Sequence, residues 1–370
     1  MGKREKVDTE YNYVVFEDNT NPFYKTTLGD LYSLENVKVF CPIFDDKPAI
    51  VQELFRFHVS ERVLKRVRLP FKSFWNRHIF KDSFNNDKPI CFLFSSSLYK
   101  LRWTGYFEYL RKNYKGCKFV YYCRDLFDWY FTRYYKFDFA YLKNTFDLIL
   151  TYDILDSIKY DLVFYPDFES MVIDGQENND SVNQVLFIGS ARNRLRLILD
   201  VYQYLTINNI KCDFYITGVP KEDRIESSGL CFADKWLPYS TVIDRTKHSS
   251  CILEIVQNHS AGYSARAMKA IGYNKKLISN AIAIRHTRFY DGKNIQYIDK
   301  PSDIDINCLL NNSIPNYGYR DEFSPVSLIN FVDEFFASGI TPEQYYHSWF
   351  DLVGYKEDAL LKYGINGGNQ

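Results

Sequence analysis

The segment from Gly262 to Asn280 (GYSARAMKAIGYNKKLISN) contains the residues best suited to bind an anion. Ser264 precedes a short helical pattern and is suited to cap it, because its hydroxyl accepts from an N–H group in the first turn. The free N–H groups, the partial positive charge of a helix N-terminus and the guanidinium of Arg266 together favour phosphate or pyrophosphate. A strand at Leu277-Ile278 follows, so the loop lies where an α/β sheet takes its ligand.

A second small-residue turn occurs at Gly189-Ser190-Ala191-Arg192, directly after the strand-like run 184–188. Such a turn brings backbone N–H groups close to a ligand, and Arg192, Arg194 and Arg196 add cations to the following helical turn. Alone the pattern is weak, because glycine at such turns is often structural and surface arginines are usually solvated. Two loops of this kind on one half-sheet predict that one phosphate group is held from two sides.

The run from Cys251 to Gly262 (CILEIVQNHSAG) leads into the first segment, and the whole pattern resembles the nucleotide-sugar domain of bacterial GT-B glycosyltransferases. It is most similar to the enzymes that assemble lipopolysaccharide and capsule. The resemblance spans about residues 85–300, with matches at 119–126, 146–151, Ile252–Ile255, Gln257, Gly262, Ser264, Arg266, Ala270, Gly272, 275–278 and Asn280.

The resemblance implies a glycosyltransferase that moves a sugar from a nucleotide-sugar donor to a growing cell-surface glycan, either lipopolysaccharide O-antigen or capsule. The expected donor-binding residues are Gly189, Ser190, Arg192, Gln257, His259, Gly262, Ser264, Arg266, Lys276 and Asn280. Two of these have a plain alternative: a lone loop histidine is more often simply exposed, and Lys276 beside a buried strand is as well explained by packing.

One position departs from the resembled group. Lys269 stands where that group usually has a Glu that reaches the donor's ribose, and Ala261 stands where retaining members often carry a second Glu. An ammonium only donates hydrogen bonds, so it cannot accept one from a ribose hydroxyl. Either another group holds the ribose, or the donor differs, or activity is lost. The last case would leave a catalytically impaired nucleotide-binding or scaffold protein, and the anomeric outcome stays open.

Transfer from a nucleotide-sugar builds negative charge on the departing phosphate. Arg192, Arg266 and Lys276 are candidates to stabilise that charge without a metal or other cofactor. If the reaction inverts, a base must take the acceptor's proton, and Asp125 is the first choice because it follows a strand that ends at Cys123. A helix cap or ion pair explains Asp125 equally well. Asp45 and Asp46 are second choices.

Composition restricts the class of protein. A chain of 370 residues is long enough for two domains, and 46 Lys+Arg balance 46 Asp+Glu, which predicts that nucleic acid is not a partner. Eight cysteines without a C-x-x-C pair favour reduced thiols over a metal site. The N-terminus lacks a signal-peptide core, and no apolar run approaches the ~20 residues that span a bilayer. We expect a cytoplasmic protein, either free or peripheral on the inner face of the cytoplasmic membrane.

Alternating strand and helix patterns predict an α/β fold of two Rossmann-like domains facing a cleft, with C-terminal helices crossing back to the first domain. The expected parts are an N-terminal extension (1–35), an acceptor-side domain (36–173), a linker (174–183), a nucleotide-sugar domain (184–324) and a C-terminal helical segment (325–370). No strand is followed by the G-x-G-x-x-G pattern of dinucleotide-binding enzymes, which argues against a nucleotide-sugar epimerase.

A basic segment interrupts the balanced charge. Residues 61–81 contain seven Lys or Arg against Glu61 alone, and Phe71, Phe74 and Trp75 are interspersed among them. Such a mixture favours docking on an anionic membrane, where a lipid-linked glycan acceptor would reside. The alternative is an amphipathic core helix with a solvated face.

Overall fold

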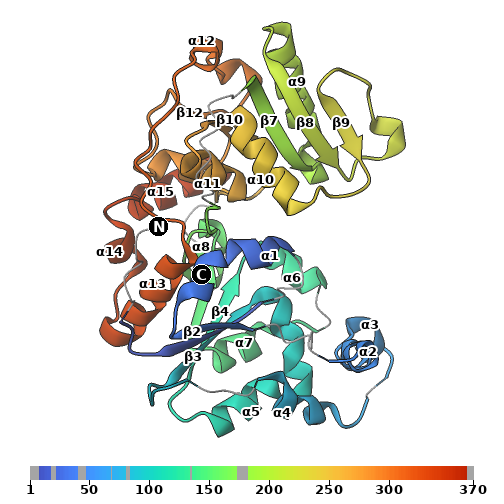
Figure 1. The fold of residues 1–370 in the computed structure, drawn as a ribbon, viewed down its shortest axis with the longest axis vertical. Coiled ribbons are helices and arrows are strands. Elements are labelled where there is room, and N and C mark those ends of the chain that lie inside the picture. Colours follow the sequence, from blue (N-terminus) through green and yellow to red (C-terminus); the bar gives the residue numbers. More distant parts are fainter. Residues whose placement is uncertain are drawn as a thin grey trace. The chain divides into compact units, whose positions relative to one another are not determined.

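The computed structural model describes residues 8–17, 22–40, 47–67, 69–80, 84–133, 136–172 and 182–364. Asp45, Asp46 and most of the predicted linker lie outside these ranges. The chain forms two compact units (Figure 1): residues 1–165 with 324–341 make unit 1, and residues 166–323 with 342–370 make unit 2. The chain therefore passes between the units three times. Within the described ranges, none of the helices combines the length and apolar character that a membrane span requires.

Unit 1 contains a six-stranded parallel sheet in the order β2-β1-β3-β4-β5-β6. Its strands are buried on both faces, as parallel strands covered by helices usually are, and aromatic rings fill the space between layers. Phe16, for example, stacks on Phe94 with ring centroids 4.8 Å apart. The strands are β1 (Asn12–Phe16), β2 (Val37–Phe40), β3 (Ile90–Ser95), β4 (Lys118–Cys123), β5 (Leu148–Thr151) and β6 (Val163–Phe164).

The helices of unit 1 are α1 (Pro22–Thr27), α2 (Ala49–His58), α3 (Glu61–Leu64), α4 (Asn76–Ile79), α5 (Tyr106–Asn113), α6 (Phe127–Arg133), α7 (Phe139–Thr145), α8 (Ile154–Tyr160) and α13 (Pro325–Ser338). The segment 1–35, expected to be an extension, instead supplies β1 to the interior of the sheet. Its apolar run, Tyr13–Phe16, has only four residues and is flanked by polar ones, so the periodicity of the sequence does not reveal the strand.

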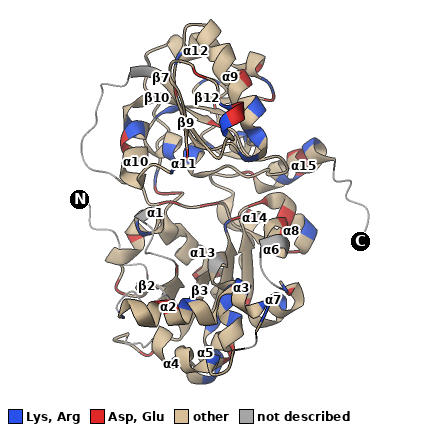
Figure 2. Ribbon diagram, turned by 90° about the vertical axis from the view of Figure 1, so that its right-hand side faces the viewer, with Lys and Arg blue, Asp and Glu red and all other residues tan. Residues whose placement is uncertain are grey.

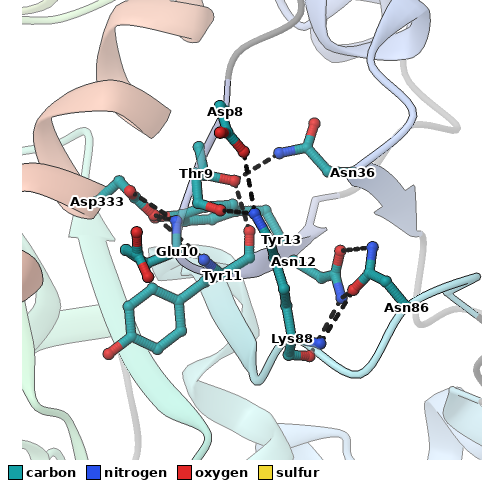
Figure 3. A network of polar contacts seen from close by, with 10 residues as sticks. All are labelled: Asp8, Thr9, Glu10, Tyr11, Asn12, Tyr13, Asn36, Asn86, Lys88 and Asp333. Carbon is teal, nitrogen blue, oxygen red and sulfur yellow. Dashed lines mark hydrogen bonds and ion pairs between the residues drawn. The ribbon is translucent and has the colours of Figure 1, made fainter.

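Helix α13 belongs to unit 1 although it comes late in the chain. Asp333 on α13 accepts hydrogen bonds from the backbone N–H of Glu10 at 2.9 Å and from the hydroxyl of Tyr13 at 2.9 Å (Figure 3). Burial, followed by nearby acidic groups that include Asp333, raises the pKa of Tyr13 far above its usual range. Ser324, which caps α13, donates to Asp30 at 2.6 Å. These contacts fasten a C-terminal helix to the N-terminal strand.

Unit 2 contains a second parallel sheet in the order β12-β11-β10-β7-β8-β9. Its strand order matches the 3-2-1-4-5-6 pattern of a Rossmann sheet in having a switch point between two central strands, here β7 and β10. The strands are β7 (Val182–Ser190), β8 (Lys211–Thr217), β9 (Leu230–Ala233), β10 (Ser249–Glu254), β11 (Lys276–Ser279) and β12 (Ile295–Tyr297).

The helices of unit 2 are α9 (Leu195–Ile207), α10 (Tyr239–His248), α11 (Ala265–Gly272), α12 (Ile306–Leu310), α14 (Pro342–Tyr346) and α15 (Leu352–Tyr363). Helix α9 illustrates why they form: Ile198, Val201, Tyr202 and Leu205 recur at helical spacing and are its buried residues. Helix α11 ends at Gly272, where a Cβ atom would lie 2.6 Å from the sulfur of Met171. Glycine there allows α11 to pack closely against the segment that enters unit 2.

Candidate active site

The candidate site lies at the carboxyl ends of β7 and β10, on either side of the switch point of the unit 2 sheet. Arg194 joins the two loops, because its guanidinium donates to the carbonyl oxygen of Ser190 at 3.1 Å and to that of Ile255. The sequence pattern placed Arg194 only as a cation in a helical turn. In the structure it holds the two loops that were predicted to meet.

Arg266 lies in the first turn of α11 and reaches back to the end of β7. Its Nε donates to the carbonyl oxygen of Ile188 at 2.9 Å, and the guanidinium lies over the ring of Phe187, 5.0 Å from the centroid. Gly189 makes this approach possible: a Cβ atom on Gly189 would lie 2.0 Å from Nη2 of Arg266. The glycine of one loop is therefore required by the arginine of the other.

A buried carboxylate organises the site from below. Glu254, at the end of β10, is fully buried, and its Oε1 accepts from both the N–H (2.7 Å) and the hydroxyl (2.6 Å) of Ser264. Its Oε2 accepts from the hydroxyl of Ser279 at 2.6 Å. The sequence signal was an acidic residue inside the apolar run CILEIV, since a buried charge must find partners. Glu254 falls inside the matching strand Ile252–Ile255, but the sequence pattern did not predict it as a site residue.

Neighbouring charges act in opposite directions on the pKa of Arg266. Burial lowers the pKa of Arg266, the carboxylate of Glu254 opposes that shift, and the neighbouring cation of Arg192 adds to it. A guanidinium nevertheless stays protonated in proteins. Arg192 and Arg194 lie in the turn that follows β7, and Arg266 lies in the first turn of α11, so three guanidinium groups come from the two loops at these strand ends. Guanidinium groups in such loops are suited to bind a phosphate.

Four more residues that the sequence predicts to bind the donor lie in loops at the same strand ends. The side-chain oxygen of Asn280 accepts from the N–H of Val256 at 2.7 Å, which ties the loop after β11 to the loop after β10. The backbone carbonyl oxygen of Gln257 accepts from the N–H of Ser260 at 3.1 Å. His259 is exposed, with a left-handed backbone (φ 68°). Gly262 is buried two residues before the cap of α11.

Lys276 is not brought to this edge. It is the first residue of β11, so it lies at the amino end of the strand, and its ammonium donates to the carbonyl oxygens of Cys308 at 2.7 Å and Leu309 at 3.4 Å. These carbonyls belong to α12, where a cation near a helix C-terminus is stabilising. Its position supports a structural role.

Lys269 forms a buried ion pair that the sequence could not reveal. Its ammonium lies 2.8 Å from Oε2 of Glu169, and both side chains are almost completely buried. The ammonium also donates to the carbonyl oxygen of Ala265 at 3.4 Å and lies 5.2 Å from the ring centroid of Tyr239. The lysine that departs from the resembled pattern is therefore matched by a carboxylate one hundred residues earlier.

Asp125 lies in unit 1, directly after β4, where its carbonyl oxygen accepts from the thiol of Cys123 at 3.0 Å. The neighbouring Asp156, on α8, accepts from the N–H of Phe127 at 2.6 Å. Burial raises the pKa of Asp156 to about 7; the Phe127 N–H opposes the shift, while Asp153 and Asp128 add to it. The sequence does not identify Asp156 as a site residue, because its raised pKa results from burial, which residue spacing does not show.

Within the described ranges, no three His, Cys, Asp or Glu side chains are grouped closely enough to hold a metal ion. No protein-family model matches the chain. No curated protein sequence matches it either.

Solved structures do match. An alpha-glucosyltransferase in complex with UDP and a 13-mer DNA aligns with a TM-score of 0.54 at 11% identity, over 87% of this chain and 98% of that one. An α,α-trehalose-phosphate synthase from Burkholderia vietnamiensis aligns with a TM-score of 0.43 at 8% identity, over 97% and 96% of the two chains. A DNA-modifying beta-glucosyltransferase aligns with a TM-score of 0.42 at 9% identity, over 94% and 98%.

The prediction that nucleic acid is not a partner is wrong, because the similar alpha-glucosyltransferase was solved in complex with DNA. The balanced total charge of the chain was the basis of that prediction, and a total says nothing about how charge is distributed over a surface. The predicted α/β class is confirmed by two six-stranded parallel sheets. The chain has the fold of GT-B glycosyltransferases, with two Rossmann-like domains.

Proposed function

We propose that the protein is a nucleotide-sugar-dependent glycosyltransferase whose donor phosphates bind at the β7/β10 edge of unit 2. The observation that carries the proposal is the position of Arg266, which is held in the first turn of α11 by the carbonyl oxygen of Ile188 and admitted there by Gly189. A guanidinium fixed beside helix N–H groups at a sheet switch point is suited to a diphosphate.

In the proposed reaction, the bond between the anomeric carbon and the phosphate oxygen breaks, and its electron pair stays on the departing nucleoside diphosphate. Arg266, Arg192 and the first N–H groups of α11 stabilise that charge, so departure is proposed to need no metal. An acceptor hydroxyl forms the new bond and gives its proton to a carboxylate. Asp125, at the carboxyl edge of the unit 1 sheet, is proposed for this step.

Two acceptor classes compete. The resemblance to lipopolysaccharide and capsule enzymes supports a cell-surface glycan. The similar alpha-glucosyltransferase solved with UDP and DNA supports a nucleic acid. Transfer of label from a radioactive nucleotide-sugar to lipid-linked glycan or to DNA distinguishes the two.

The second candidate function is a nucleotide-binding scaffold without turnover. The observation that favours it is the pairing of Lys269 with Glu169, since α11 then offers no carboxylate to a ribose hydroxyl. Binding of a nucleotide without hydrolysis or transfer, across donors and acceptors, would support the scaffold.

The test begins with thermal-shift measurements against UDP, GDP, CMP and dTDP sugars, followed by calorimetry with the best ligand. Arg266→Ala should weaken binding at least tenfold, because a charged hydrogen bond to phosphate is worth about 1.5–3 kcal/mol. The matched control is Arg196→Ala, since the Arg196 side chain is 96% exposed and pairs only loosely with Asp200 at 3.9 Å. Unchanged affinity in Arg266→Ala would reject the site.

A further inference from the structure

A surface of unit 1 combines exposed cations with exposed aromatic rings and has no part in the donor site. It is formed by Arg62, Lys65 and Arg66 from α3 and the turn after it, and by Phe71, Phe74 and Arg77 around η2 (Lys72–Trp75). We call these six residues the α3–η2 surface. Helices α2 and α3 lie side by side at the margin of unit 1 in Figure 1, and the cations are blue in Figure 2.

Two hydrogen bonds attach this surface to the rest of unit 1. The indole N–H of the buried Trp75 donates to Nδ1 of His58 at 3.0 Å, which fixes η2 to α2. The indole N–H of Trp103 donates to Glu61 at 3.3 Å, which fixes α3 to the segment Ser96–Thr104. Glu61 is the only acidic residue in the sequence 61–81, and this hydrogen bond directs it toward the body of unit 1. The cations dominate what the surface presents outward.

The exposed positions of the two rings are unfavourable for the isolated folded protein. Phe71 is 82% exposed and its backbone is left-handed (φ 58°), a conformation unfavourable for a bulky residue by roughly 1–3 kcal/mol. Phe74 is 51% exposed, and the guanidinium of Arg77 lies 5.4 Å from its ring centroid. Phe74 packs one edge against the buried Trp75, with ring centroids 5.8 Å apart, but half of its surface stays exposed, and Phe71 is exposed over most of its surface. A contact with another molecule would cover both rings.

We propose that the α3–η2 surface binds a single-stranded segment of nucleic acid, with the cations on phosphates and the rings of Phe71 and Phe74 against bases. The presence of exposed cations and exposed rings on the same elements suits a polymer that carries both phosphates and bases. A lipid surface is the other anionic partner to consider. It favours a long helix with separate charged and apolar faces, whereas α3, η2 and α4 have four residues each. The short helices, together with the exposed rings beside the cations, therefore favour nucleic acid over a lipid surface.

Binding at this surface does not depend on the donor site, although its use as an acceptor surface rests on the proposed transferase. The direct test is fluorescence anisotropy of a labelled DNA strand of about 20 nucleotides, with the full chain. Arg62→Gln/Arg66→Gln should lower the slope of log affinity against log salt by about 0.7 for each phosphate that is no longer neutralised. Phe71→Ala should weaken binding about tenfold. The control Lys211→Gln/Lys221→Gln, two exposed cations of unit 2, should bind like the wild type.

An abasic strand of equal length separates stacking from charge. Phe71→Ala should bind it like the wild type, because the strand has phosphates but no bases. Equal affinity of wild type and Arg62→Gln/Arg66→Gln for the normal strand would overturn the proposal. So would sedimentation with phosphatidylserine vesicles in the absence of strand binding. Arg266→Ala should bind the DNA strand like the wild type, because Arg266 is not part of the α3–η2 surface. Failure of the nucleotide-sugar proposal would therefore leave strand binding unchanged, and the two proposals can be rejected separately.

Discussion

At the residue scale, the proposed donor site depends on the absence of a side chain at one position. Gly189→Ala should weaken nucleotide binding at least tenfold, because its methyl group would occupy the place of the Arg266 guanidinium. The backbone of Gly189 does not have a positive φ, so strain of the main chain is not the cause. Calorimetry checks the loss. In an Arg266→Ala background the same change should cost little, and an additive loss would contradict the contact.

A second residue-scale prediction concerns pH. The pKa of Asp156 is raised to about 7, so the folded protein holds a proton that the unfolded chain releases near its ordinary value of 3.8. Stability from this group is complete below the unfolded pKa and is lost as pH rises through about 7. Asp156→Asn should therefore raise Tm at pH 8, with a gain that shrinks towards pH 4.

Asparagine keeps an oxygen for the N–H of Phe127, so the hydrogen bond is not the variable in this comparison. Differential scanning fluorimetry over a series of pH values measures the effect. The exposed Asp223 offers a control, since Asp223→Asn should leave the pH dependence of Tm unchanged. A gain in Tm that does not change with pH would contradict the assignment of the titration to Asp156.

At the scale of elements, the Glu169–Lys269 pair ties α11 to the segment that enters unit 2. Removing one partner leaves a buried charge alone, and Lys269→Met should cost about 3–5 kcal/mol of unfolding free energy. The double variant Glu169→Leu/Lys269→Met should recover most of this loss, because neither charge then remains buried. Urea denaturation measures both. Equal instability of the single and double variants would show that packing, and not charge, explains the loss.

The elements also show how far sequence reasoning reached. The loop–helix–strand pattern around Ser264 and Arg266 was predicted closely, since capping and periodicity are local properties. For Lys276 the sequence left two alternatives open, a phosphate ligand or a packing role, because the strand end that a residue occupies decides which groups it meets. The structure shows the second, with the ammonium on a carbonyl oxygen of α12. Glu169 and Asp156 were missed for the same reason: their partners lie far away in sequence or their character comes from burial.

At the scale of the whole molecule, each unit is assembled from separate stretches of chain. Asp333 on α13 accepts from the N–H groups of Glu10 and Tyr11 and from the hydroxyl of Tyr13, so the C-terminal region completes unit 1. Asp333→Ala should destabilise unit 1 by about 1–3 kcal/mol, because the buried hydroxyl of Tyr13 is left without its acceptor and two backbone N–H groups lose theirs. Hydrogen exchange should rise at residues 9–16, while thermal stabilisation of unit 2 by a nucleotide should persist. Loss of that response would show that the two units do not unfold separately.

Local chemistry in the sequence determined the α/β class and the basic, aromatic composition of residues 61–81, and it predicts anion binding at the two glycine loops. These properties follow from spacing and residue type within a few turns of chain. Only the tertiary structure decided that β7 and β10 are neighbours, so that Gly189 makes room for Arg266 and Glu254 holds Ser264. Strand order, burial and distant pairing arise from contacts between remote residues, and no local pattern encodes them.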